Sequence, residues 1–158
     1  MIHIKKINQS DSETVTNFLS IEKNLNNLFD IGWSEKNFIN QLKKNNNLSL
    51  GLFEKSKLQG ILIGDLIPQN NSMDYELHLI YVASDKRRMN FASRLLGYLE
   101  MHIKKFNIEK IFLEVSENNK QAINFYEKND FVFFKIRHNY YRYDNMSINA
   151  KCYMKKYN

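Results

Sequence analysis

The sequence predicts an α+β domain built around a central mixed sheet. Short runs rich in β-branched, aromatic and other apolar residues follow one another at 48–53, 58–66 and 73–82, with polar segments between them. Two segments with helical spacing precede these runs, and a helix and a strand-helix-strand unit follow them. Strands grouped in series between helices are typical of an α+β architecture.

The composition predicts one globular domain. The chain has 158 residues, of which 43% are hydrophobic and 13% aromatic, and it has one proline. This length suits one packed core and is too short for two comfortable domains, so we expect a single domain over 1–158. No apolar run approaches the roughly 18 residues of a membrane span, and the first residues lack the apolar stretch of a signal peptide. We therefore expect a cytoplasmic protein.

The net charge and the single cysteine carry less information. A charge of +6 predicts attraction to polyanions such as nucleic acid, the ribosome or a phosphorylated cofactor, without choosing among them. Cys152 has no second cysteine with which to form an internal disulfide. We expect it to be a small core residue without a catalytic role.

The first half of the chain is predicted to form a strand, two helices and a meander. Residues 2–7 alternate in polarity like a strand, and the side chains at 10–12 can start a helix that runs to about Lys23. Ser34 is the N-cap candidate of a second helix, with Glu35 in its first turn, and this helix fades over 43–47. The three apolar runs are joined by short polar segments at 54–57 and 68–72, which predicts antiparallel pairing.

The second half is predicted to add two helices and three strands. Apolar residues at helical spacing predict a helix over 90–105. A strand at 111–115, a helix at 119–128, and strands at 131–136 and 150–154 complete the chain. The predicted order is β-α-α-β-β-β-α-β-α-β-β.

The first candidate site is the connection between the run at 73–82 and the helix at 90. A loop that opens a helix leaves the first backbone N–H groups without partners inside the helix, and with the helix dipole they attract phosphate. Arg87 and Arg88 add positive charge at this point. The pattern predicts a phosphate site or, alternatively, a solvated basic loop.

The second candidate site is the segment from Leu113 to Phe131. It reads as a strand that ends at Glu114, a polar turn, and an amphipathic helix whose second turn carries Tyr126. The segment can place one carboxylate and one phenol at the same end, and acyl transfer to an amine needs two such proton-handling groups. The alternatives are that Glu114 is an exposed strand residue and that Tyr126 is a core aromatic.

Together the two motifs resemble the GNAT (Gcn5-related) N-acetyltransferase family. The pyrophosphate loop of that family reads Gln/Arg-x-x-Gly-x-Gly/Ala, and this chain has Arg87-Arg88-Met89-Asn90-Phe91-Ala92. Asn90 replaces the first glycine, and asparagine tolerates a left-handed backbone at a cost of about 1 kcal/mol. With ordinary dihedrals Asn90 would instead cap the helix.

Within that family the chain most resembles the ribosomal-protein-alanine N-acetyltransferases (RimI type), over most of its length. The similar segments are Trp33-Ser34-Glu35-Lys36-x-Phe38, Leu113-Glu114-Val115 with Asn119, Ala122-Ile123, Tyr126-Glu127 and Phe131, and Arg137-His138-Asn139-Tyr140-Tyr141. Asp130 stands where a glycine is usual, so Asn129 or Asp130 would have to end the helix. The resemblance implies a mostly antiparallel central sheet flanked by helices.

The resemblance also implies roles for individual residues. Acetyl-CoA would be the cofactor, Glu114 the general base and Tyr126 the general acid. The implied cofactor contacts are Ile80, Tyr81, Val82, Arg87, Arg88, Met89, Asn90, Phe91, Ala92, Ser93 and Asn119, and the implied acceptor contacts are Glu76, Tyr140 and Tyr141. Glu76 is also a rival base, and His78 is a weaker one. Trp33 is expected to pack against other residues and not to touch the substrate.

An α-amine is the acceptor that this chemistry favours. Its pKa lies near 8, against about 10.4 for lysine, so the neutral amine costs about 3 kcal/mol less. We expect Glu114 to work through water or with a pKa raised by burial, and Tyr126 to stabilise charge on the departing thiolate. Direct attack by the amine needs no enzyme nucleophile, and no metal site is expected.

The expected function is therefore acetyl transfer from acetyl-CoA to the N-terminal amine of a protein, in particular a ribosomal protein. Contact with nucleic acid would be incidental, through the ribosome. One alternative is acetylation of a small amine such as a polyamine or an aminoglycoside. The other is a ribosome-associated CoA-binding module without catalytic activity.

Overall fold

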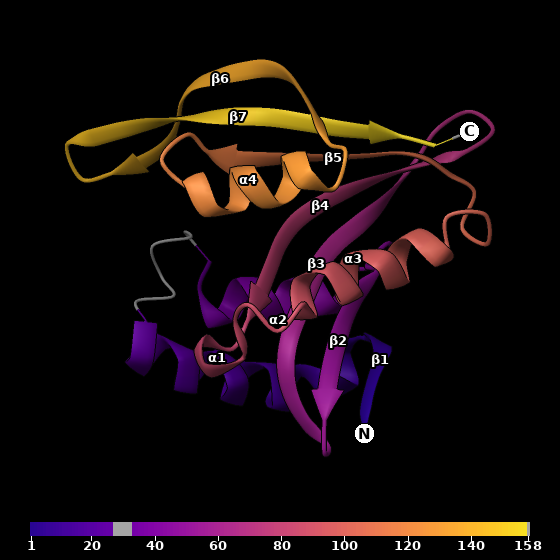
Figure 1. Cartoon of the computed structure of the whole chain (residues 1–158), viewed down its shortest axis with the longest axis vertical. Helices are drawn as coiled ribbons and strands as arrows, with labels where there is room; N and C mark the ends of the chain where they lie inside the picture. The colour runs from indigo at the N-terminus through magenta and orange to yellow at the C-terminus, as the bar shows by residue number, and fades with distance from the viewer. Residues whose placement is uncertain (27–32, 158) are drawn as a thin grey trace. The chain divides into compact units, whose positions relative to one another are not determined.

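The computed structural model describes residues 1–26 and 33–157 and confirms the predicted α+β architecture (Figure 1). Seven strands form one sheet in the order β1-β2-β3-β4-β5-β7-β6. The β1–β2, β2–β3, β5–β7 and β6–β7 ladders are antiparallel, and the β4–β5 ladder is parallel. The sheet is therefore mixed and mostly antiparallel.

The elements follow the predicted order, with two short 3-10 helices (η) added. They are β1 Ile2–Ile7, η1 Gln9–Asp11, α1 Ser12–Asn26, α2 Glu35–Lys43, β2 Ser49–Glu54, β3 Lys57–Pro68, β4 Met73–Val82, η3 Ser84–Lys86, α3 Phe91–Met101, β5 Ile108–Ser116, α4 Lys120–Lys128, β6 Val132–Tyr143 and β7 Met146–Lys156. The chain divides into two compact units, Met1–Leu66 with Leu79–His102, and Ile67–His78 with Ile103–Asn158. We call them unit 1 and unit 2.

Local capping sets where the first two helices begin. Asn8 starts a turn ahead of α1: its side chain accepts from the backbone N–H of Ser10, and the Asp11 carboxylate accepts from the N–H of Asn8. This capping box delays the α-helix to Ser12. Ser34 caps α2 as predicted, and its hydroxyl accepts from the N–H of Asn37 at 3.2 Å.

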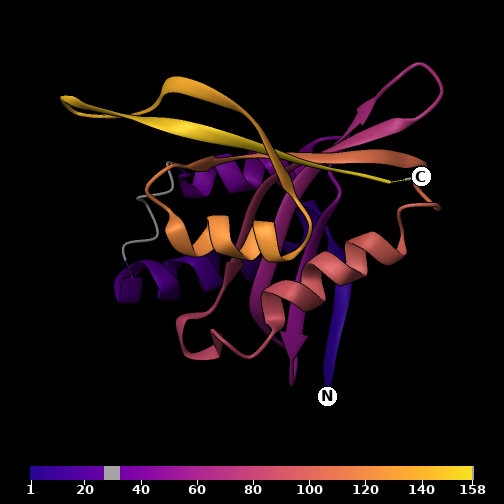
Figure 2. The same cartoon turned by 45° about the horizontal axis from the view of Figure 1, so that its top comes forward.

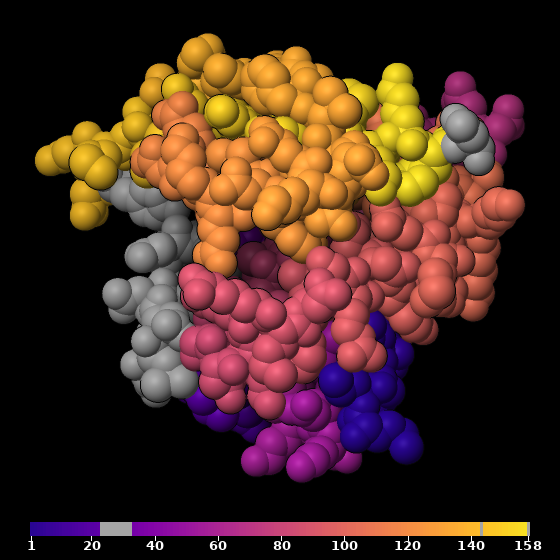
Figure 3. All heavy atoms as spheres, in the orientation of Figure 1, coloured from indigo at the N-terminus to yellow at the C-terminus, as the bar shows by residue number. Residues whose placement is uncertain are grey.

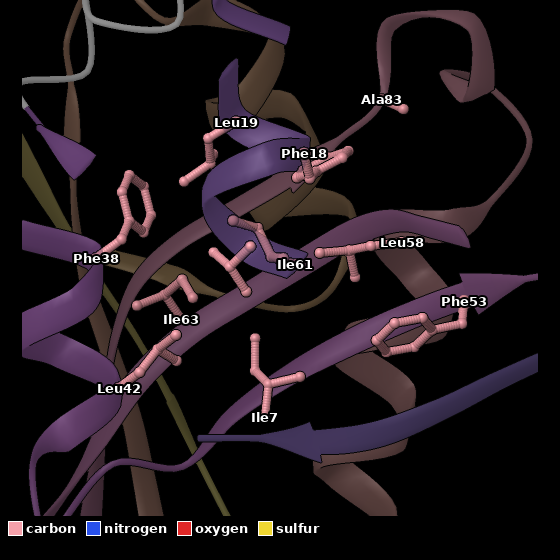
Figure 4. Packing of buried hydrophobic residues seen from close by; sticks show 11 residues of the cluster. Ile7, Phe18, Leu19, Phe38, Leu42, Phe53, Leu58, Ile61, Ile63 and Ala83 are labelled. Atoms are coloured by element: carbon pink, nitrogen blue, oxygen red, sulfur yellow. The ribbon is translucent and has the colours of Figure 1, made fainter. Parts of the chain in front are cut away.

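The core of unit 1 lies between α1, α2 and the sheet (Figure 4). Apolar side chains from both helices pack on those of β1, β2 and β3, and the buried set is Ile7, Val15, Phe18, Leu19, Phe38, Leu42, Phe53, Leu58, Ile61, Ile63 and Ala83. Trp33 packs on Phe38 with ring centroids 4.8 Å apart, as predicted. Helix α3 packs against β3 at Gly60, where an added Cβ would lie 3.3 Å from Leu95.

Helix α3 is shorter than predicted. It ends at Met101, and the N–H of His102 bonds back to Leu99. The His102 imidazole lies 2.8 Å from the carbonyl oxygen of Tyr98, which gives a terminal carbonyl a partner. The apolar residues at 103 and 106 therefore belong to the connection after the helix.

Unit 2 consists of the first part of β4, strands β5, β7 and β6, and helix α4 (Figure 2). Leu113 pairs with Tyr153, and the Tyr153 hydroxyl donates to Glu127 of α4 at 2.8 Å. Helix α4 therefore covers the sheet face that carries Leu113 and Tyr153. Because side chains alternate along a strand, Glu114 points to the opposite face. The β6–β7 hairpin extends well past the end of β5 (Figure 2).

The end of α4 is built as the sequence suggests. Asn129 is the C-cap, and Asp130 follows with a φ of 66° in the left-handed region that usually favours glycine. No helix in the described ranges is long and apolar enough to cross a membrane.

Candidate active site

The connection between β4 and α3, in unit 1, has an unusual backbone. Arg88 and Asn90 both lie in the left-handed region, with φ of 62° and 66°. The prediction that Asn90 takes the place of a positive-φ glycine is confirmed. The Asn90 side chain makes no capping hydrogen bond, so asparagine serves here for its backbone and not as a side-chain cap.

The N-terminus of α3 is consequently open to an anion. The carbonyl of Asn90 accepts from the N–H of Arg94, and no side chain of residues 1–26 or 33–157 is recorded as capping the N–H groups of the first turn. Phe91, Ala92 and Ser93 supply these N–H groups. Uncapped N–H groups at a helix start attract phosphate oxygens, and the pink atoms of this segment lie on the surface in Figure 3. The site fits a phosphorylated cofactor.

The basic residues of this loop differ in how they are held. Lys86 is paired with Glu54 at 2.6 Å. Arg88 makes no ion pair with any residue in the described ranges, and the neighbouring Met89 is exposed. Arg88 is thus available to a bound anion, whereas Lys86 ties the loop to β2.

A hydrogen-bonded chain that no local sequence pattern predicts supports the same loop. The carboxylate of Glu22, on α1, accepts from the Tyr81 hydroxyl at 2.9 Å and from the N–H of Ser84 at 3.1 Å. The Arg87 guanidinium donates to the Tyr81 hydroxyl at 3.2 Å and lies 5.4 Å from the centre of its ring. Glu22 is only 3% exposed. Burial and the bond to Glu22 raise the pKa of Tyr81 to about 12.

The last residues of β4 have backbone groups that could bind the cofactor. The parallel ladder with β5 runs from Met73 to Leu77. Ile80, Tyr81 and Val82 lie beyond the end of this ladder, at the other end of the strand. The β4–β5 ladder does not use their backbone groups on that edge, which suits their predicted contact with the cofactor.

In unit 2, Glu114 belongs to a polar cluster on the face that α4 leaves uncovered. Its carboxylate forms an ion pair with Arg137 and accepts a hydrogen bond from the Tyr140 hydroxyl. Arg137 also stacks on the Tyr140 ring at 4.3 Å. The bond to Glu114 raises the pKa of Tyr140 to about 12 and raises the pKa of Arg137 as well. Glu114 is therefore held in place, with 22% of its side chain exposed.

The rival base shares this face. Glu76 pairs with Phe112, two residues before Glu114, so its side chain points to the same side. It is more exposed than Glu114, at 36% against 22% of the side chain, and it lies 3.9 Å from the His78 ring nitrogen. Either carboxylate can reach solvent on this face.

Tyr126, on α4, is a buried residue whose ring is held by aromatic neighbours. The residue is 7% exposed, and its ring packs edge-on against Phe125 and Phe131 at 5.5 and 5.6 Å. Among the described residues no hydrogen-bond partner of the hydroxyl is recorded. Burial of the ring raises the pKa of Tyr126, so it remains protonated at neutral pH.

The remaining predicted residues have structural partners. The Asn119 side chain accepts from the N–H of Ala122 at 3.1 Å and so caps α4. Tyr141 packs edge-on against Tyr140 at 5.0 Å. Cys152 is buried beside Glu114, and burial raises the pKa of its thiol, as expected for a core residue. No group of metal-binding side chains occurs among residues 1–26 and 33–157.

Solved structures show the same fold. The ribosomal-protein-S18-alanine N-acetyltransferase from Escherichia coli is 23% identical, with a TM-score of 0.78 over 99% of this chain and 94% of that chain. Arabidopsis thaliana NAA60 with a bisubstrate analogue is 16% identical, with a TM-score of 0.81 over 99% and 98%. Arabidopsis thaliana Naa50 with the bisubstrate analogue CoA-Ac-MVNAL is 19% identical, with a TM-score of 0.78 over 99% of each chain.

The sequence itself matches a family model. No curated protein matches the chain in sequence. The model described as "Acetyltransferase (GNAT) family" matches residues 18–131, a range that contains both the β4–α3 loop and the segment with Glu114 and Tyr126. The start of α3, the left-handed Asn90 and the buried Tyr126 all lie within this match. The chain therefore belongs to the acetyltransferase (GNAT) family and is an acetyl-CoA-dependent N-acetyltransferase.

Proposed function

We propose that the chain, as one domain over 1–158, acetylates the N-terminal α-amine of a protein in the cytoplasm, specifically of a ribosomal protein. The observation that carries the proposal is a pair of groups in unit 2: the Glu114 carboxylate, which is held by Arg137 and partly exposed, and the Tyr126 phenol, which stays protonated at neutral pH. The similarity to a ribosomal-protein-S18-alanine N-acetyltransferase supports the choice of acceptor.

The β4–α3 loop is proposed to hold the cofactor. The N–H groups of Phe91, Ala92 and Ser93 would bind its pyrophosphate, with Asn90 shaping the turn and Arg88 adding charge. Arg87 would contribute from the position that Tyr81 fixes. The remaining predicted contacts are Ile80 and Val82 through their backbone, and Met89 and Asn119. Acetyl-CoA, when bound, supplies an acetyl thioester whose acetyl group can pass directly to an amine.

Glu114 is proposed to act as the general base that accepts a proton from the acceptor amine. The amine attacks as the neutral form, and its surplus proton must leave as the new amide bond forms. Glu114 can accept it through water, because part of the carboxylate is exposed. Its ion pair with Arg137 fixes the position of the carboxylate on this face of unit 2.

Tyr126 is proposed to act on the sulfur of the cofactor, which is the leaving group of the acetyl transfer. Because burial raises its pKa, complete proton transfer to a thiolate is less favourable than for an ordinary tyrosine. Donation of a hydrogen bond to the developing negative charge needs no such transfer. We therefore assign Tyr126 as a hydrogen-bond donor to the departing sulfur, which later takes its proton from the hydroxyl or from solvent.

A small-amine acceptor is the second candidate, and one observation favours it. Glu76 and Glu114 lie on the same face of unit 2, and two carboxylates would attract a polyamine or an aminoglycoside. The pairing of Glu114 with Arg137 and Tyr140 removes much of that attraction. Tyr140 and Tyr141 instead offer aromatic surface and a hydroxyl near the peptide that a protein acceptor would present.

Acetyl-CoA turnover against a panel of acceptors tests the proposal. The panel contains a peptide that begins with Ala, a lysine peptide with a blocked N-terminus, and spermidine. We expect turnover with the first peptide to exceed the other two at least tenfold. Fastest turnover with spermidine would establish the small-amine alternative. Cofactor binding by calorimetry without turnover on any member would establish the non-catalytic alternative.

A further inference from the structure

The β4–α3 loop and the start of α3, in unit 1, carry more cations than the protein itself uses. Residues 86–99 contain four Lys or Arg residues and no Asp or Glu. Lys86 is paired with Glu54 at 2.6 Å, and Arg87 donates to the Tyr81 hydroxyl at 3.2 Å. The side chains of Arg88 and Arg94 have no recorded ion pair or hydrogen bond with residues 1–26 or 33–157. Two cations therefore remain for a ligand.

Arg94 lies one helical turn after the proposed phosphate site. Its N–H donates to the carbonyl of Asn90 at 3.0 Å, and its side chain is exposed. Side chains in an α-helix lean toward its N-terminus, so a long side chain at this position covers the surface of the first turn. Arg94 can thus reach an anionic group next to the one that the N–H groups of 91–93 would hold.

The cofactor carries two separate anionic groups. Acetyl-CoA has a pyrophosphate and, one ribose away, a 3′-phosphate monoester with a charge of about −1.5 to −2 at pH 7. The proposed cofactor site, on which this inference rests, accounts for the pyrophosphate alone: it uses the N–H groups at the start of α3 and Arg88, which precedes them. A phosphate monoester is bound well by arginine, whose guanidinium donates two parallel hydrogen bonds to it.

We infer that Arg94 binds the 3′-phosphate of the cofactor and makes the chain prefer CoA to 3′-dephospho-CoA. Arg88 lies before the N–H groups with a φ of 62°, whereas Arg94 lies after them on the regular helix. The two arginines thus flank the pyrophosphate site and can bind different groups. Arg94 is a specificity-determining residue in this assignment, because a cofactor without the 3′-phosphate gains nothing from it.

Calorimetric titration of the full chain with CoA and with 3′-dephospho-CoA, at low ionic strength, tests this inference. We expect the unchanged chain to bind CoA about 5- to 20-fold more tightly, as a charge-assisted bidentate contact at an exposed site allows. Arg94→Gln should lower the affinity for CoA by about the same factor and that for 3′-dephospho-CoA less than about twofold. The matched control is Arg142→Gln, which removes an exposed arginine from unit 2 and should keep the preference for CoA.

Four results would overturn the inference while the proposed cofactor site stands. Arg94→Gln could weaken both ligands equally, which would place Arg94 at the pyrophosphate, or it could weaken neither. The unchanged chain could bind both ligands with the same affinity, or Arg142→Gln could lose the preference as well, which would make the effect one of net charge. Failure of the unchanged chain to bind either ligand would instead contradict the proposed cofactor site, and the inference would fall with it.

Discussion

Replacing Tyr81 by Phe should weaken acetyl-CoA binding although the hydroxyl itself is not proposed to touch the cofactor. The hydroxyl joins Glu22 at 2.9 Å to Arg87 at 3.2 Å. Its loss leaves the ring in place but releases the guanidinium from its acceptor. Arg87 must then be ordered when the cofactor binds, and ordering a long side chain costs up to about 2 kcal/mol. We expect an affinity loss of about 5- to 30-fold.

The same substitution should also lower stability. A hydrogen bond to a charged group contributes about 1.5–3 kcal/mol, and Glu22 keeps its bond to the N–H of Ser84 at 3.1 Å. We therefore expect a loss of about 2 kcal/mol and a Tm lower by about 4–8 °C for a chain of this size.

Calorimetric titration with acetyl-CoA and thermal unfolding of the same samples measure the two effects. Tyr98→Phe is the matched control, because it removes a hydroxyl from the same unit without breaking a hydrogen bond among the described residues. A lower Tm with unchanged Kd would show that Tyr81 stabilises the fold without positioning Arg87. No change in either quantity would refute the whole Glu22–Tyr81–Arg87 chain.

The remaining predictions concern single residues. Tyr126→Phe should keep acetyl-CoA affinity within threefold and lower turnover at least tenfold. Unchanged turnover would contradict the role of Tyr126 as a hydrogen-bond donor to the departing sulfur. Glu114→Gln should lower turnover at least tenfold and Glu76→Gln less than threefold, whereas the reverse ranking would make Glu76 the base. Asn90→Gly should raise Tm by about 2–4 °C, because glycine adopts a φ of 66° without the roughly 1 kcal/mol penalty, and a lower Tm would contradict this. The pKa of Tyr140 is raised to about 12, so its stabilising contribution is present below pH ~10 and is lost as the pH rises towards 12. Unfolding free energy should therefore fall less between pH 10 and 12 in Tyr140→Phe, and an equal fall would count against the bond to Glu114.

Local patterns predicted most of the fold. Alternating polarity and turn residues predicted the positions of the first five strands. Each of these strands buries one or both of its faces, so the hydrophobic pattern that predicts it lies within its own segment. Ser34 was predictable as a cap because capping depends on residues within one turn. The left-handed conformation of Asn90 followed from the resemblance to a loop that requires a glycine there.

The missed features depend on distant or exposed residues. The bond between Glu22 and Tyr81 joins residues 59 positions apart, and that between Glu114 and Arg137 joins residues 23 apart, so no local pattern signals either. The last two strands are much longer than predicted, since β6 extends to Tyr143 and β7 begins at Met146. Most of this added hairpin is exposed and mixes charged with aromatic residues, so it lacks the alternation that burial imposes.

The central claim is that the α-amine of a protein N-terminus is the acceptor, and one peptide can test it directly. The peptide begins with Ala, carries a free lysine several residues later, and is incubated with the full chain and acetyl-CoA. Tandem mass spectrometry then locates the added acetyl group. We predict acetylation at the N-terminal amine, with less than a tenth as much on the lysine. Acetylation chiefly on the lysine, or on neither amine while acetyl-CoA is bound, would contradict the claim.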